Sequence, residues 1–156
     1  MGVLSKTLKA LALILSLILS LGSTLIALDA QSLAKQGIRI IDQNSYTTSE
    51  TAVIEVAIQV ENTGFFFELY DVNVTLSIFD NNNVTYDVDS GYIEYLSLGE
   101  SEILNLTLEI PIDVAAEWNA GNIELYVRVF FYLWFGKYNY KLLGFGIAGI
   151  INLRGE

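Results

Sequence analysis

The chain has 156 residues, of which 53% are hydrophobic and 17% charged, and 18 Asp+Glu against 8 Lys+Arg give it a net charge of −10. It contains no His and no Cys, which excludes thiol nucleophiles, disulfides, zinc fingers and His-based acid–base catalysis. The acidic balance argues against nucleic acid as a partner, because phosphate backbones attract basic surfaces.

The longest apolar segment lies near the N-terminus of the chain. A short segment, residues 1–9, contains Lys6 and Lys9, and an uncharged run of nineteen residues, 10–28, follows it and ends before Asp29. As a helix this run reaches roughly 28 Å, close to the thickness of a bilayer core. Its eleven Leu and Ile residues favour insertion by about 3 to 7 kcal/mol. We therefore expect residues 10–28 to form a transmembrane helix with the lipid bilayer as its partner.

The charges on either side of this run predict its orientation. Lys6 and Lys9 precede the run, and Asp29 follows it. The positive-inside rule then predicts a single-pass membrane protein with a cytoplasmic segment at residues 1–9 and an extracellular C-terminal domain.

Three outcomes remain open for the N-terminal segment. It can stay in the membrane as a signal anchor. Signal peptidase can remove it, although cutting after Ala30 or Ala27 would put Leu28 or Leu25 where small residues are needed. Finally, Lys9-Ala10-Leu11-Ala12-Leu13 resembles the processing site of archaeal type IV prepilins. That resemblance implies a mature chain that begins at Leu11 and a helix that packs in a filament core.

The remainder of the chain has the pattern of a mainly β protein. Residues 29–37 are polar and form a stalk or continue the helix, and residues 38–156 form the folded domain. Apolar and polar residues alternate, as in strands with one buried face, most clearly in residues 54–60, 72–78, 104–110 and 123–129. Weaker strands are expected at residues 38–41, 84–88, 92–98 and 138–143, with a helical turn at residues 113–119. Seven or eight such strands predict an antiparallel, immunoglobulin-like β-sandwich, with a barrel as the alternative.

The turns between these strands have a recognisable order. An Asn-centred turn, Asn62-Thr63-Gly64-Phe65, follows one strand, Leu98-Gly99-Glu100 precedes a Thr/Leu strand, and Phe135-Gly136-Lys137-Tyr138 closes a final hairpin. This order resembles the LEA14-like, or water-stress/hypersensitive-response (WHy), β-sandwich, which usually has Asn-Pro-Asn in the first turn. The resemblance implies a sandwich, an association with stress protection and no catalytic residues to carry over. CARDB-like and immunoglobulin-like modules of cell-surface proteins show similar strands and an Asn-Thr-Gly turn.

Two aromatic segments are candidate interaction sites. Three adjacent rings cannot all face one core, so Phe65, Phe66 and Phe67 fill a loop-end plug or form a binding tip. Past Val129 both faces of a strand become apolar. These residues are either covered on both sides or form an exposed patch that marks a partner or a membrane surface, through Phe130, Tyr132 and Trp134.

Three sequons place candidate glycans on Asn73, Asn83 and Asn105. The carboxylates of Asp80, Asp87 and Asp89 lie around one predicted hairpin, but the spacing lacks the third ligand and the glycine of a Ca²⁺ loop. We expect a solvated turn there and no metal. Phosphate-binding and nucleophile-elbow motifs are absent from the sequence, so we expect no cofactor and no enzymatic activity.

These features predict a non-enzymatic, membrane-anchored, extracytoplasmic β-sandwich that acts as a structural or binding module at the cell surface. The alternative is a subunit of an extracellular filament. Such a subunit would pack through its helix or donate a strand from residues 38–41 or from the Gly-rich C-terminus. Its partners would be other copies of the chain or proteins of the cell envelope.

Overall fold

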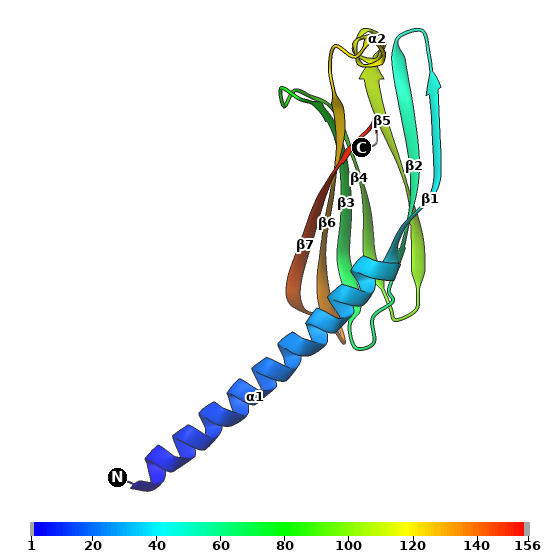
Figure 1. Cartoon of the computed structure of the whole chain (residues 1–156). Helices are drawn as coiled ribbons and strands as arrows, with labels where there is room; N and C mark the ends of the chain where they lie inside the picture. The colour runs from blue at the N-terminus through cyan, green and yellow to red at the C-terminus, as the bar shows by residue number, and fades with distance from the viewer. Residues whose placement is uncertain (1, 155–156) are drawn as a thin grey trace.

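The computed structural model describes the backbone of residues 2–154 and the side chains of residues 13–154. A long helix, α1 (Gly2–Ser32), protrudes from one end of an elongated β-sandwich (Figure 1). One π-helical turn, η1 (Leu33–Gly37), joins it to the first strand. The side chains of residues 9–12, in the stretch that resembles a prepilin processing site, lie outside the described part.

The sandwich consists of seven strands and one short helix. The strands are β1 (Ile38–Thr47), β2 (Thr51–Glu61), β3 (Glu68–Asp80), β4 (Thr85–Leu96), β5 (Ser101–Pro111), β6 (Leu125–Lys137) and β7 (Tyr140–Asn152), and α2 (Ile112–Ala120) lies between β5 and β6. The strands form two antiparallel sheets with the orders β1-β2-β5 and β4-β3-β6-β7. The predicted antiparallel sandwich is therefore confirmed, and two separate sheets replace the barrel alternative.

The alternating side chains of both sheets meet in one core. Its largest fully buried side chains come from β2, β3, β4, β5 and β6, together with Leu33 from η1, and include Phe135, Leu33, Leu69, Ile78, Ile93, Leu106, Leu108, Leu125, Leu133 and Val60. Because the same alternation that predicted the strands also sorts these residues inward, the core follows directly from the sequence pattern.

Three predicted element boundaries were wrong. The chain passes straight through the predicted turn at Ser90-Gly91, so the two predicted strands at residues 84–88 and 92–98 are one strand, β4. A Cβ atom at position 91 would lie 3.0 Å from the methyl carbons of Leu104, so Gly91 lets Leu104 pack closely against β4. The predicted strand at residues 138–143 continues to Asn152 as β7, and α2 has nine residues instead of a single turn.

The two long sides of the sandwich differ. On one side β4 and β5, which belong to different sheets, are joined by side chains. Asp87 accepts a hydrogen bond from the backbone N–H of Glu109, and Asp89 from that of Thr107, each at 2.7 Å. These carboxylates cover backbone donors of the edge strand β5.

On the other side, the edges of β1 and β7 stay apart and leave an apolar slot of ≈ 460 Å³. Its lining comes from both sheets and includes Ile40, Val56, Leu76, Val129 and Ile151. The slot is therefore a continuation of the core that opens between two edge strands.

Candidate functional site

The most elaborate polar arrangement in the described residues joins α1 to the sandwich. The Asp29 side chain is 1% exposed. Its Oδ1 atom accepts the backbone N–H of Phe65 at 2.8 Å, and its Oδ2 atom accepts those of Phe66 at 3.0 Å and Phe67 at 2.8 Å. A buried carboxylate is stable only with such partners, so this contact fixes the end of α1 to the β2–β3 loop.

The same loop is organised by a second buried polar residue, Asn62, which is 1% exposed. Its Nδ2 atom donates to the carbonyl oxygens of Phe67 and Leu96, each at 3.1 Å, and its Oδ1 atom accepts the N–H of Gly64 at 3.2 Å. The backbone of Asn62 also pairs with the β4–β5 turn through Gly99 and Glu100. Asn62 therefore holds together the two turns beside the helix.

The junction between helix and strand is tightly packed. Leu33 is 1% exposed and Ala30 is buried, while Leu25 and Ile26 pack against the core from outside. Ser32 donates to the carbonyl oxygen of Thr63 at 2.8 Å. Residues 29–37, expected as a stalk or a continuation of the helix, thus contain helix and a π turn with buried contacts.

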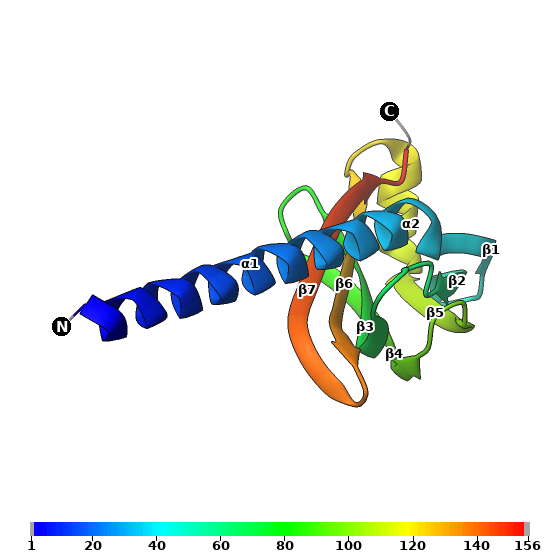
Figure 2. The same ribbon diagram turned by 90° about the horizontal axis from the view of Figure 1, so that it is seen from below.

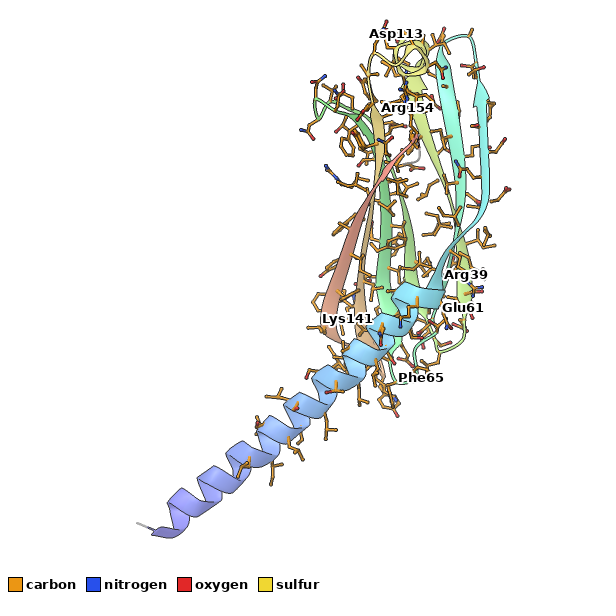
Figure 3. The ribbon with its side chains drawn as sticks, viewed as in Figure 1. Arg39, Glu61, Phe65, Asp113, Lys141 and Arg154 are labelled. Carbon is orange, nitrogen blue, oxygen red and sulfur yellow. The ribbon has the colours of Figure 1, made fainter. Side chains whose placement is uncertain are left out.

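Arg39 and Glu61 form an ion pair at 2.6 Å where the chain turns from η1 into β1 (Figure 3). Seen from below, α1 runs across the end of the sandwich, past β7 and β6, before it reaches that turn (Figure 2). The hydrogen bonds that fix α1 to the sandwich join Asp29 and Ser32 to residues 63–67 of the β2–β3 loop.

Three turns form the end of the sandwich next to α1 (Figure 1). We define the helix-proximal tip as the exposed apolar and aromatic residues of these turns: Phe65 (69% exposed), Phe66 (36%), Leu98 (45%) and Tyr138 (77%). Phe65 extends away from the sandwich beside α1 (Figure 3). Phe67, by contrast, is buried and packs its ring edge against Phe135. The segment thus divides between a buried ring, Phe67, and the exposed rings of Phe65 and Phe66, whose role in binding stays a prediction.

Direct contacts connect the β6–β7 turn to this tip. The ammonium of Lys137 donates to the carbonyl oxygen of Phe66 at 3.2 Å and lies 5.7 Å from the ring centre of Tyr138. The backbone N–H of Asn139 donates to the hydroxyl of Tyr70 at 3.0 Å. These bonds hold Tyr138 and Phe66 on the same end of the sandwich.

A charge pair lies just above the tip. The Lys141 ammonium pairs with Asp71, and the Tyr92 hydroxyl donates to the same carboxylate at 2.7 Å. These two hydrogen bonds, first that from Lys141, lower the pKa of Asp71 below its usual value. Asp71 therefore stays ionised in moderately acidic solution.

The second aromatic segment lies on the outer face of the four-stranded sheet. Phe131, Leu133 and Phe135 point into the core, whereas Phe130 (42% exposed) and Tyr132 (37%) point outward. The Tyr132 and Trp134 rings meet edge to face at 6.2 Å. These outward rings lie over glycines of β7, since a Cβ on Gly144 would be 2.7 Å from the Tyr132 hydroxyl. Phe130 and Tyr132 therefore match the prediction of exposed rings, and their role in binding stays a prediction.

The three sequon asparagines lie in different settings. Asn83 is exposed in the β3–β4 turn, Asn105 is exposed on β5, and Asn73 is half-buried on β3, where it accepts a hydrogen bond from Thr75 at 3.0 Å. Their glycosylation stays a prediction, and Asn83 and Asn105 offer the more open attachment points.

The carboxylate of Asp80 closes the β3–β4 turn. It accepts the N–H groups of Asn82 at 2.8 Å and Val84 at 2.9 Å, and the hydroxyl of Tyr86 at 2.9 Å. These bonds, chiefly that from Val84, lower the pKa of Asp80. Asp80 is thus a turn-forming residue, and among the described residues no group of three or more acidic side chains is arranged to hold a metal ion.

Sequence reasoning missed Asp29, Leu98 and Tyr138 as parts of one site. In the sequence, Asp29 marks the end of the apolar run and contributes to the predicted orientation of the helix, and neither feature indicates a buried contact. The available signal was a single carboxylate directly after that run, together with a later Asn-Thr-Gly turn rich in free backbone donors. The pairing joins residues 36 to 38 positions apart, which no local pattern reveals.

No family model and no curated protein matches the chain. Among solved structures, a candidate ApaA protein from Bordetella pertussis shares 12% identity, covers 74% of this chain and 89% of its own, and has a TM-score of 0.49. A protein from Archaeoglobus fulgidus shares 14% identity over 75% of this chain and 95% of its own, with a TM-score of 0.39. A candidate β-galactosidase from Bacteroides fragilis shares 14% identity over 75% of this chain but only 16% of its own, with a TM-score of 0.40. Likenesses this distant carry no functional information.

Proposed function

We propose that the protein is a non-enzymatic β-sandwich, anchored in the membrane by α1 and displayed outside the cell as a structural or binding module. The observation that carries this proposal is the rigid, buried junction between an apolar helix and a sandwich. The helical stretch Leu13–Gly37, which comprises most of α1 and all of η1, is long and apolar enough to cross a bilayer. An 18-residue window within it has a mean hydropathy of 2.0, and little of that window is buried.

The exposed face of α1 supports a lipid partner. Its large apolar side chains are more than half exposed from Leu13 to Leu21. Burying one such side chain is worth about 1.5 to 3 kcal/mol, so leaving all of them in water would be strongly unfavourable. A bilayer covers them on every side, which a single protein groove would not do.

Several finer features belong to the same proposal. The charges Lys6, Lys9 and Asp29 favour a cytoplasmic N-terminus. Only two of the eight basic residues precede Asp29, so residues 29–156 carry six basic and 18 acidic residues, a net charge of −12. Such a charge keeps a domain soluble and gives it no electrostatic attraction to an anionic cell surface. The LEA14-like resemblance stays part of the proposal at the level of the sandwich fold, and the exposed positions of Asn83 and Asn105 favour a glycoprotein.

The intact mass of the native protein, taken from carbonate-washed membranes, tests this proposal. We expect the protein to remain in the washed membranes with a mass that begins at Met1 or Gly2, plus glycans on the sequon asparagines if they are attached. Recovery in the soluble fraction with a start near Gln31 would contradict membrane anchoring.

A filament subunit is the second candidate, and one observation favours it. The exposed apolar part of α1 continues straight out of the sandwich (Figure 1), as a helix that packs among other helices must. Packing through α1 is the form we retain, because the two proposed donor segments are already paired, β1 with β2 and β7 with β6. A native mass beginning at Leu11 would favour this candidate.

A further inference from the structure

We propose that the helix-proximal tip, formed by Phe65, Phe66, Leu98 and Tyr138, rests in the phospholipid headgroup layer of the membrane that α1 crosses. The sandwich is then docked on the bilayer surface. This inference rests on the proposed function, because it requires α1 to lie in a bilayer.

The depth of the tip follows from the length of the apolar run. Nineteen uncharged residues, 10–28, match the hydrocarbon core, so its outer boundary falls at about Leu28. Asp29 comes next, and its carboxylate is bonded to the N–H of Phe65 at 2.8 Å. Leu25 and Ile26, about one turn earlier, already pack against the sandwich. The tip therefore overlaps the last apolar turn of the helix.

The junction gives the tip little freedom to move away from this depth. Asp29 and Asn62 are each 1% exposed and fully engaged with the loop that carries Phe65 and Phe66. At Gly37 a Cβ would lie 2.5 Å from the carbonyl oxygen of Glu61, so helix and sheet are in direct backbone contact. Separation of the tip from the helix would require these buried bonds to break.

The chemistry of the tip fits the headgroup layer. Aromatic residues concentrate at membrane interfaces, where the ring is apolar and the edge or hydroxyl stays wet. Phe65 and Tyr138 are among the most exposed aromatic residues of the described chain, and Lys137 lies between Phe66 and Tyr138. The net charge of −12 in residues 29–156 argues against electrostatic adsorption. The contact is therefore apolar, and we expect it to be insensitive to salt.

The opposite end of the sandwich provides the contrast. There the β1–β2 turn exposes Ser49 and Glu50, and α2 exposes Asp113 (Figure 3). Insertion of these polar residues into lipid is unfavourable. The helix-proximal tip is therefore the position to probe, and the opposite end is its control.

Nitroxide depth measurement on the full chain in phosphatidylcholine vesicles tests the proposal. The native chain has no Cys, so Phe65→Cys, Ser49→Cys and Ile18→Cys each carry one label. We expect the ratio of oxygen to nickel-chelate accessibility at position 65 to lie between those at 49 and 18, and several-fold above that at 49. If the accessibility ratio at position 65 equalled that at position 49 while position 18 still gave a bilayer-like ratio, the docking proposal would be overturned. The anchor would remain intact. A water-like ratio at 18 would instead overturn the proposed function.

Two further readouts separate the alternatives. Spin–spin broadening at position 65 without increased oxygen access would mean contact between copies of the chain, and would overturn lipid docking.

In a Leu98→Cys background, F65S together with F66S should lower the oxygen-to-nickel ratio at position 98 toward the value in water. The matched pair F130S and Y132S removes two exposed rings from the sheet face and should leave that ratio unchanged. If both double variants gave the same oxygen-to-nickel ratio at position 98, the result would contradict the role of Phe65 and Phe66.

Discussion

The Oδ2 atom of Asp29 lies 2.8 Å from the backbone nitrogen of Phe67, a residue 38 positions further along the chain. Phe67 is buried against the core, so this one bond connects the end of the apolar helix with the interior of the sandwich. It makes the end of the helix part of the folded domain, so the proposed membrane anchor would be coupled directly to the sandwich.

Replacement of Asp29 by Asn should loosen this junction. The amide has almost the same shape, but either orientation places its NH₂ group against at least one backbone N–H that now binds a carboxylate oxygen. Losing a hydrogen bond to a charged group, or leaving a buried donor unpaired, destabilises a protein by up to about 3 kcal/mol. We therefore expect a loss of about 3 kcal/mol in the free energy of unfolding. Denaturant unfolding of the full chain in detergent micelles measures this loss.

Asp42→Asn is the matched control, because Asp42 is exposed on β1. It should change the free energy of unfolding by no more than about 0.5 kcal/mol. Equal effects of the two substitutions would mean that the Asp29 contacts do not stabilise the fold.

Replacement of Asn62 by Asp should destabilise the protein strongly, although the two side chains have nearly the same size. Both Nδ2 hydrogen bonds, to Phe67 and Leu96, would become contacts between a carboxylate and two carbonyl oxygens. We expect destabilisation of about 3 kcal/mol or more, measured as the change in the unfolding midpoint. Asn105→Asp, on an exposed position of β5, should leave the midpoint nearly unchanged, and a similar shift in both variants would disprove the structural role of Asn62.

Replacement of Gly37 by Ala should strain the passage from η1 to β1. The new methyl group would lie 2.5 Å from the carbonyl oxygen of Glu61 and 2.6 Å from a methyl carbon of Leu33. We expect a loss of about 1 to 3 kcal/mol, since the backbone has to shift. Gly22→Ala serves as control because a Cβ there meets no atom within 4 Å; it should not destabilise the protein.

The hydrogen bonds of the Asp80 carboxylate should stabilise the folded chain less at acidic pH. Its pKa is lowered in the folded state relative to the ordinary value of 3.8, so the unfolded chain takes up this proton at higher pH than the folded one. The stabilisation is complete above pH 3.8 and disappears as the pH falls through the lower folded pKa. Thermal melts of the native chain and of Asp80→Asn should therefore differ most at neutral pH and converge below that range. A difference in Tm that stays constant down to about pH 2 would contradict the role of the ionised carboxylate.

The helix and most strands could be predicted because their signals are local. An uncharged run of helix length and the alternation in β2, β3, β5 and β6 identify their own elements. The continuous β4 was missed because Ser90-Gly91 is a good turn sequence in isolation, and only the position of Leu104 on a neighbouring strand explains that glycine.

The site was less predictable than the fold. Three adjacent aromatic residues identify the Phe65–Phe67 segment in the sequence. Leu98 and Tyr138 join it because Asn62 and Lys137 connect three turns that are distant in the chain. Such contacts between distant segments depend on strand order, which a single sequence does not specify.

The central claim, a sandwich fixed outside the cell by a membrane helix, is tested most directly by labelling Ser49→Cys with a membrane-impermeant maleimide in intact cells. The residue is exposed on the turn between β1 and β2, at the end of the sandwich away from α1. We predict rapid labelling before lysis and recovery of the labelled chain with the membranes. Labelling only after lysis would place the sandwich in the cytoplasm and contradict the proposed orientation.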